Sequence, residues 1–185
     1  MPRTRGTVRI QGHDYSESGE YCVTMCTFQM RCLFGEIKNG QIRLNPFGQV
    51  VEEEWLKTSC LRSDVKLDEF VIMPNHVHGI VKFRDFQAEQ KLACDPFKRT
   101  AVRPYAEHVS SPLRCPPGSL GSIVKGFKSA CQRRINLLGQ TPEKPVWQRN
   151  YHEHIIRDDQ DLDDVLEYIQ ANPLRWKQEH PRAWH

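Results

Sequence analysis

The stretch Met73–Val81, MPNHVHGIV, decides the fold because it places a sharp turn between two runs of β-forming residues. Pro74 cannot donate a hydrogen bond to a neighbouring strand, and a Pro-Asn pair is typical of tight turns. We therefore expect a hairpin whose turn is formed by Pro74 and Asn75, with strands at 67–73 and 76–83.

Two histidines lie in the second strand of this hairpin, with one residue between them. Alternate residues of a strand point to the same face of a sheet, so His76 and His78 project together and Val77 projects to the other face. If Val77 and Ile80 share the core with the helices, both imidazoles lie on the open face, where one metal ion could bind both. The pair is also compatible with two polar residues on a half-exposed sheet, because a metal site needs further ligands.

The rest of the chain supplies the other elements. Asn39-Gly40 predicts a hairpin turn, Asn45 followed by Pro46 predicts the start of a helix, and Pro173 is expected to end the last helix. Outside the Pro-Asn hairpin we expect a strand at 21–28, a small hairpin at 36–44, helices at 46–60 and 120–138, a strand at 146–157 and a helix at 158–172.

Apart from the small hairpin, the order of these elements is βαββαβ followed by a helix. This order predicts an α+β fold of the ferredoxin-like type, in which a four-stranded antiparallel sheet carries helices on one face, with a small hairpin insertion and a C-terminal helix. One domain is expected over 1–185, with a flexible basic arm at 1–18 and a long loop at 84–117. The open sheet face is a natural place for a nucleic-acid strand or a catalytic site.

Composition narrows the class of protein without naming an activity. The net charge of +3 is compatible with nucleic acid as a partner but does not require it. No run of apolar residues is long enough for a membrane span, and the N-terminus lacks the apolar segment of a secretory signal. The seven cysteines are odd in number and contain no CxxC motif, which predicts reduced thiols in a cytoplasmic protein.

The last predicted helix carries a tyrosine and an asparagine one turn apart. Tyr168 and Asn172 lie on one stripe of the helix, so both could face the neighbouring sheet. The alternative is a boundary tyrosine that buries its ring and keeps its hydroxyl in water.

Four blocks of this sequence together resemble the single-tyrosine HUH transposases: MPNHVHGIV, LGSIVKGFKSACQRRIN, VWQRNYHEHIIR and DVLEYIQANPLRW. Within them, the REP-associated tyrosine transposases are the most similar group, and the resemblance covers roughly residues 15–176. It implies an endonuclease and strand transferase for single-stranded DNA that recognises DNA hairpins and works as a monomer or homodimer.

The resemblance also implies the roles of individual residues. His76, His78 and Asn172 would bind one divalent metal ion, with Mg²⁺ or Mn²⁺ as the working metal, and Tyr168 would be the nucleophile that forms a 5′-phosphotyrosine. Insertion-sequence members often have Gln where this chain has Asn172. By ligand type alone, Mn²⁺, Zn²⁺ or Ni²⁺ would also bind well. Tyr151 lies beside two histidines and is the competing candidate for the nucleophile.

DNA contacts are expected from basic and polar side chains on one helix and one strand. These candidates are Lys125, Lys128, Arg133, Arg134, Gln148, Arg149 and Arg157. Trp147 and Tyr151 could stack on unpaired bases, although Trp147 could equally belong to the core. His154 could either assist the site or orient a neighbour.

Two other functions remain open on the sequence. One is an RNA-binding module of the same fold, although the central strand presents histidines rather than the aromatic residues of such modules. The other is a catalytically degenerate or domesticated protein that binds DNA or RNA hairpins without cutting them.

Overall fold

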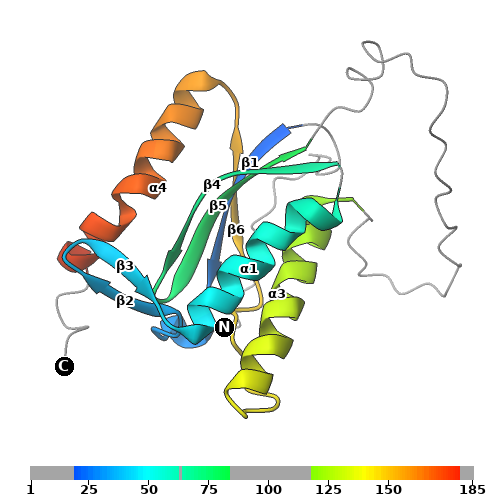
Figure 1. Ribbon diagram of the computed structural model, residues 1–185. Helices are drawn as coiled ribbons and strands as arrows, with labels where there is room; N and C mark the ends of the chain where they lie inside the picture. Colours follow the sequence, from blue (N-terminus) through cyan, green and yellow to red (C-terminus); the bar gives the residue numbers. More distant parts are fainter. Residues whose placement is uncertain (1–18, 63, 84–117, 180–185) are drawn as a thin grey trace, which may run out of the picture.

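The computed structural model describes residues 19–62, 64–83 and 118–179 (Figure 1). The expected arm at 1–18 and the expected loop at 84–117 lie outside the described residues. The elements are β1 (Gly19–Cys26), η1 (Phe28–Met30), β2 (Gly35–Lys38), β3 (Gln41–Leu44), α1 (Pro46–Leu61), β4 (Val65–Met73), β5 (His76–Phe83), α3 (Leu120–Leu138), β6 (His152–Ile156) and α4 (Asp159–Glu179). None of the described helices is long and apolar enough to cross a membrane.

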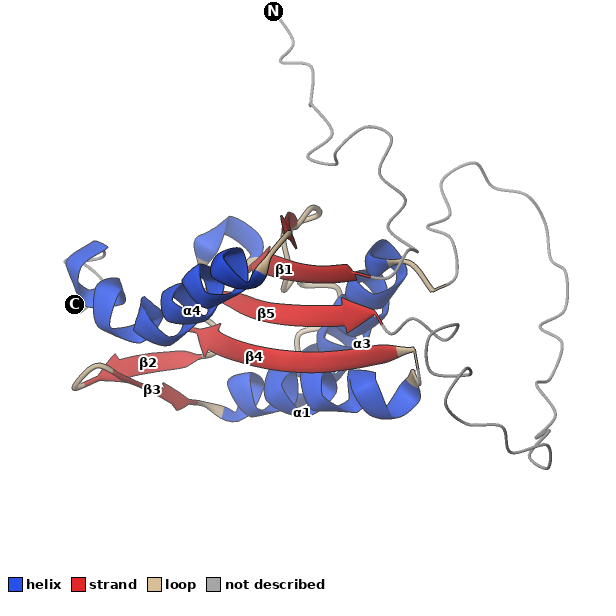
Figure 2. Ribbon diagram, turned by 90° about the horizontal axis from the view of Figure 1, so that it is seen from above, coloured by secondary structure: helices blue, strands red, loops and turns tan. Residues whose placement is uncertain are grey.

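A four-stranded antiparallel sheet forms the centre of the fold, with the strand order β4-β5-β1-β6. The predicted α+β architecture is therefore confirmed, including the separate β2–β3 hairpin. Helices α1 and α3 cover one face of the sheet, and α4 lies across the other face (Figure 2).

Alternation along the strands divides the side chains between these two layers. Val23 and Val77 pack in the main core with α1 and α3, whereas Cys22 and Ile80 pack against α4. The expectation that Ile80 shares the core of Val77 is wrong, because residues three apart on a strand point to opposite faces. The histidines lie on the α4 side of the sheet, as their alternation with Val77 predicts.

Glycine is required at position 79 by the close approach of α1. A Cβ atom at Gly79 would lie 2.4 Å from the ring of Trp55, which is completely buried between α1 and the sheet. The position of α1 thus depends on a strand residue without a side chain. At its start, Asn45 caps α1 by accepting hydrogen bonds from the backbone N–H groups of Phe47 and Gly48, with Pro46 at the first helical position, as predicted.

Helix α4 does not end at Pro173 but continues to Glu179, so the predicted boundary at 172 is wrong. Proline lacks the N–H that would bond to the carbonyl group four residues earlier, which normally ends or kinks a helix. Here Trp176, only 4% exposed, packs with Ile37 and Met73. Burial of this large ring compensates for the lost hydrogen bond and keeps the final turns helical.

The predicted strand at 146–157 is also shorter than expected, since β6 covers only His152–Ile156. Trp147 forms an isolated antiparallel bridge with Thr27, and the chain between this bridge and β6 is irregular. The polarity of this segment reflects its position at the edge of the sheet rather than within it.

Candidate active site

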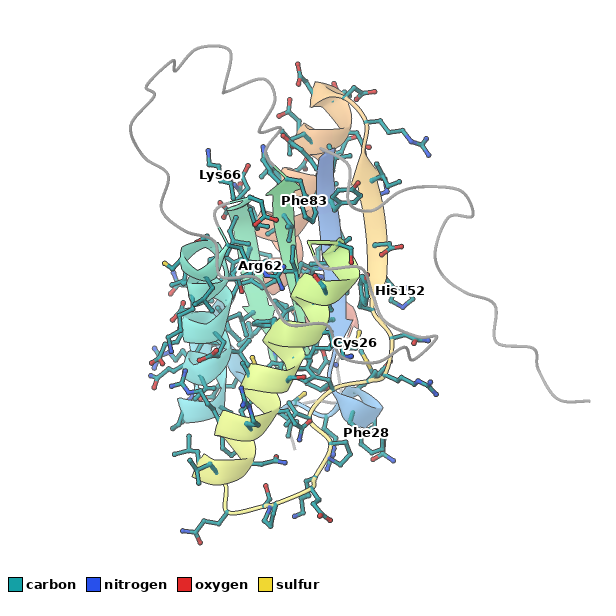
Figure 3. The ribbon with its side chains drawn as sticks, turned by 90° about the vertical axis from the view of Figure 1, so that its right-hand side faces the viewer. Cys26, Phe28, Arg62, Lys66, Phe83 and His152 are labelled. Carbon is teal, nitrogen blue, oxygen red and sulfur yellow. The ribbon has the colours of Figure 1, made fainter. Side chains whose placement is uncertain are left out.

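The two histidines of β5 form a close pair on the face of the sheet that α4 covers. Their ring centres are 4.6 Å apart, with the rings nearly perpendicular. The strand register places His78 beside Thr24 of β1, and Thr24 in turn beside His152 of β6. Figure 3 shows His152 on β6, which is an edge strand of the sheet.

His78 is held as a neutral imidazole. It is 5% exposed, and its Nδ1 atom lies 2.8 Å from the hydroxyl oxygen of Thr24. Burial, and to a smaller extent the neighbouring His76, lower the pKa of His78 to about 3. Its Nε2 atom is buried and has no hydrogen-bond partner among the residues that the structure describes. A buried polar atom of this kind is costly unless something binds it, and a neutral imidazole nitrogen is a common metal ligand.

Three side chains of α4 lie on the stripe of the helix that faces the histidine pair. The ring of Tyr168 lies 5.1 Å from the ring of His78, and the ring of Trp176 lies 5.9 Å from the ring of His76, centre to centre. Asn172 is one turn from each of these aromatic residues, on the same stripe of the helix, and is 7% exposed. Tyr168 therefore contacts the histidine pair, and Asn172 lies on α4 between the two aromatic residues that do so.

This set of side chains fits a divalent metal ion. The described residues contain no group of three or more His, Cys, Asp or Glu side chains that could bind a metal, so a site built from these residues alone needs a third ligand of another type. An asparagine carboxamide supplies an oxygen ligand that suits Mg²⁺ and Mn²⁺, and imidazole suits many divalent metals. Asn172 would be the candidate for that oxygen, since it lies one turn from each of the two α4 residues whose rings contact the imidazoles.

The two candidate tyrosines lie on opposite sides of the sheet. Tyr151 packs against the main core, on the side of α1 and α3. Tyr168 is 44% exposed on the other side and contacts His78. Of the two phenols, only that of Tyr168 is next to the histidine pair.

His154 orients a neighbour rather than joining the histidine pair. Its Nε2 atom lies 2.7 Å from Oδ1 of Asp161, and the other carboxylate oxygen of Asp161 accepts the backbone N–H of Arg157. The hydrogen bond to His154 holds the pKa of Asp161 below its usual value. Asp158 caps the helix by accepting the backbone N–H of Asp161. These bonds fasten the start of α4 to the end of β6.

The expected DNA-contacting residues fall into two groups. Lys128 donates from Nζ to the carbonyl oxygens of Gln148 and Asn150, at 3.1 and 2.8 Å, and burial lowers its pKa to about 8. Arg134 forms ion pairs with Glu53 and Glu54 of α1, each at 2.6 Å. The charges of Lys128 and Arg134 are thus engaged within the fold. The exposed basic candidates are Lys125, Arg133, Arg149 and Arg157.

Trp147 belongs to the core. It is 7% exposed, and its ring packs against Phe34 and Phe127. The ammonium group of Lys128 lies 6.0 Å from the ring centre of Trp147 and 5.9 Å from that of Tyr151. Lys128 therefore holds the segment before β6 in two ways. It donates hydrogen bonds to backbone carbonyl groups of that segment, and its ammonium group lies near the rings of Trp147 and Tyr151.

Three residues around the site were missed in the sequence: Thr24, Asn75 and Asp161. The position of Asn75 after Pro74 predicts a turn, but this pattern does not indicate the contact of its side chain with His76. Asp161 follows Asp158 by three residues, which is the spacing of a capping motif. Thr24 has no local signal, because its contact with His78 joins two strands far apart in the chain.

Comparisons with known proteins find two sequence relatives of this chain. No protein-family model matches the chain. A Haemophilus influenzae protein of uncharacterized function is 36% identical over 176 residues, which are 95% of this chain and 91% of that protein. A second protein from H. influenzae, described as a "Putative REP-associated tyrosine transposase", is 25% identical over 103 residues, or 49% of this chain and 58% of that protein.

The fold is shared with a solved structure of a REP-associated tyrosine transposase bound to a REP hairpin. The TM-score is 0.58 with 16% identity, and the match covers 91% of this chain and 74% of the other. Together with the sequence relatives, this likeness in fold supports the resemblance to REP-associated tyrosine transposases found in the four sequence blocks.

Proposed function

We propose that the protein is a metal-dependent endonuclease and strand transferase for single-stranded DNA, acting next to hairpins of the REP type. The observation that carries the proposal is the contact between Tyr168 and His78, whose ring centres are 5.1 Å apart. It brings an exposed phenol to a pair of imidazoles, one of which has a buried nitrogen without a hydrogen-bond partner in the described part of the chain. That combination supplies both a nucleophile and a place to bind the cation that a phosphodiester needs.

His76, His78 and Asn172 would bind one Mg²⁺ or Mn²⁺ ion. When bound, such an ion offsets the negative charge of a phosphodiester and helps to orient its leaving oxygen. The low pKa of His78, about 3, keeps the imidazole neutral and able to act as a ligand at physiological pH. Two imidazoles and one amide would leave an ion of this kind able to bind water and phosphate oxygens as well.

Tyr168 would attack the phosphorus atom in line. A bond forms between phosphorus and the phenolic oxygen, the bond to the 3′ oxygen breaks, and that oxygen takes up a proton. The products are a 5′-phosphotyrosine and a 3′-hydroxyl group. His78 is a poor acceptor for the phenolic proton because its pKa is lowered to about 3, whereas the 44% exposure of Tyr168 gives water access to the proton. A second 3′-hydroxyl can attack the adduct, which rejoins strands.

Hairpin DNA is the proposed partner for two reasons. The solved relative was captured with a REP hairpin, and four basic side chains of this protein are exposed on α3 and around β6. Because α3 and α4 cover opposite faces of the sheet, DNA that touches both Tyr168 and the exposed residues of α3 has to pass around an edge of the sheet. The exposed Arg149 and Arg157 flank the edge strand β6. We propose that edge as the path of the strand.

The test is covalent capture of DNA. Single-stranded DNA with a hairpin, labelled at its 3′ end, is incubated with the protein and Mn²⁺, and adducts are separated on a denaturing gel. The wild-type protein should form an adduct that chelator abolishes, and Tyr168→Phe should form none. Tyr151→Phe is the matched control and should keep the adduct, because Tyr151 lies on the other side of the sheet.

Two results would contradict the proposal. An adduct that persists in Tyr168→Phe, with the linked peptide mapped elsewhere, would exclude Tyr168 as the nucleophile. Tight hairpin binding by the folded wild-type protein without any adduct would instead indicate a protein that binds hairpins and does not cut them.

A further inference from the structure

The turn between β4 and β5 is buried, although it lies at the tip of a hairpin. Asn75 is 2% exposed. Its carbonyl oxygen accepts the backbone N–H of Thr27 at 2.8 Å, and the carbonyl oxygen of Pro74 accepts those of Leu33 and Phe34 at 2.8 and 3.0 Å. The segment after β1 therefore wraps around the turn that precedes the two histidines and holds it in place.

The side chain of Asn75 connects this wrapping segment to His76. Its Nδ2 atom donates to the carbonyl oxygen of Met30 at 3.3 Å, and its Oδ1 atom lies 2.7 Å from Nδ1 of His76. A reversed amide would place two oxygens against each other at Met30, so the carbonyl of Met30 determines which way the amide points. Oδ1 can only accept, and Nδ1 of His76 has to be the donor.

The carbonyl of Met30 has an unusual backbone around it. Gln29 and Met30 have φ angles of 58° and 55°, a left-handed conformation that residues with side chains adopt rarely. Such a conformation persists when the surrounding contacts enforce it, and it often accompanies a functional site. Here it turns the chain so that the Met30 carbonyl meets the amide of Asn75.

We infer that Asn75 is a positioning residue that fixes His76 in the tautomer with its proton on Nδ1. Nε2 of His76 then carries the lone pair. This is the nitrogen through which His76 would bind a metal ion. In a metal-binding histidine, the hydrogen bond made by one ring nitrogen sets the tautomer and orientation of the other. The inference rests on the proposed function for the identity of the ligand, but the tautomer is a property of the metal-free protein.

His78 provides an internal comparison. Its Nδ1 atom meets the hydroxyl of Thr24, which can either donate or accept, so that contact does not decide the tautomer. The amide of Asn75 leaves no such choice at His76. The two histidines should therefore respond differently when their partners are changed.

The experiment measures the tautomer directly. Imidazole ¹⁵N resonances are recorded on metal-free, ¹⁵N-labelled protein at neutral pH, with Mn²⁺ affinity measured in parallel. In the wild type, Nδ1 of His76 should show the shift of a protonated nitrogen and Nε2 that of an unprotonated one. Asn75→Ala should lose this pattern, and its dissociation constant for Mn²⁺ should rise by about 10- to 100-fold.

Two variants separate positioning from general damage. Asn75→Asp keeps an acceptor for Nδ1–H, so it should restore the wild-type tautomer even though it cannot donate to Met30. Asn150→Ala changes an exposed asparagine and should alter neither measurement. Circular dichroism and thermal melting establish that each variant is folded.

The wild-type spectrum alone can overturn the inference, which covers the case in which Asn75→Ala does not fold. A proton on Nε2 of wild-type His76 would refute it, and so would a folded Asn75→Ala protein with unchanged tautomer and unchanged Mn²⁺ affinity. If the wild type shows the Nδ1–H tautomer yet neither binds Mn²⁺ nor forms a DNA adduct, the tautomer assignment stands and the proposed function is wrong.

Discussion

At the scale of single residues, the site depends on an imidazole that stays neutral. His78 is 5% exposed, and its pKa is lowered to about 3 because the charged form would lose its hydration. The unfolded chain binds this proton near the ordinary histidine pKa of 6.5, so between these two values the unfolded state binds more protons than the folded state. The free energy of unfolding therefore decreases as the pH falls through 6.5 toward 3.

This difference in the pKa of His78 between the folded and unfolded states predicts that His78 accounts for most of the loss of stability in mild acid. Between pH 7 and pH 5, the burial of His78 should cost the metal-free protein about 2 kcal/mol of unfolding free energy. His78→Gln should remove most of that loss, whereas His152→Gln, at an exposed histidine of the same sheet face, should keep the wild-type pH dependence. Urea denaturation at the two pH values measures both. Equal losses in His78→Gln and the wild type would show that His78 is not the group responsible.

At the scale of elements, α4 is fixed at both ends and carries its functional residues between them. His154 and Asp161 fasten its first turn to β6, and Trp176 anchors its last turns against Ile37 and Met73. Tyr168 and Asn172 lie between these anchors. The helix can therefore present a tyrosine that is 44% exposed without losing its position over the sheet.

The C-terminal anchor is predicted to control the helix beyond Pro173. Trp176→Ala removes a large buried ring, and substitutions of this kind cost about 3–5 kcal/mol. We expect the final turns of α4 to lose amide protection in hydrogen exchange while β1 keeps its own, because the proline already weakens the helix there. Leu174→Ala is the matched control on an exposed neighbour of the same helix, 67% exposed. Unchanged protection in Trp176→Ala would mean that the ring does not hold these turns.

At the scale of the whole molecule, features encoded locally were predictable from sequence and features that depend on distant partners were not. The Pro-Asn turn, the cap at Asn45 and the common face of the two histidines follow from local geometry, and all three are present. The continuation of α4 through Pro173 required the packing of Trp176 on a hairpin more than a hundred residues away. The contacts of Lys128 and Arg134 likewise became visible only once α1 and the segment before β6 were placed beside α3.

Those contacts lead to a final prediction about how the molecule holds DNA. Arg149 is exposed, whereas Arg134 is paired with two carboxylates of α1. Of these two arginines, we therefore expect Arg149 to be the one that binds a phosphate group. A lost phosphate contact lowers the affinity for DNA and reduces the slope of log affinity against log salt by about 1. Arg149→Ala should show both effects in fluorescence anisotropy with a hairpin that has a single-stranded flank. Arg134→Ala should instead lower the melting temperature and leave the salt slope unchanged. If Arg134→Ala changed the salt slope and Arg149→Ala did not, the DNA would have to bind the α1–α3 surface, away from the edge of β6 and from Tyr168.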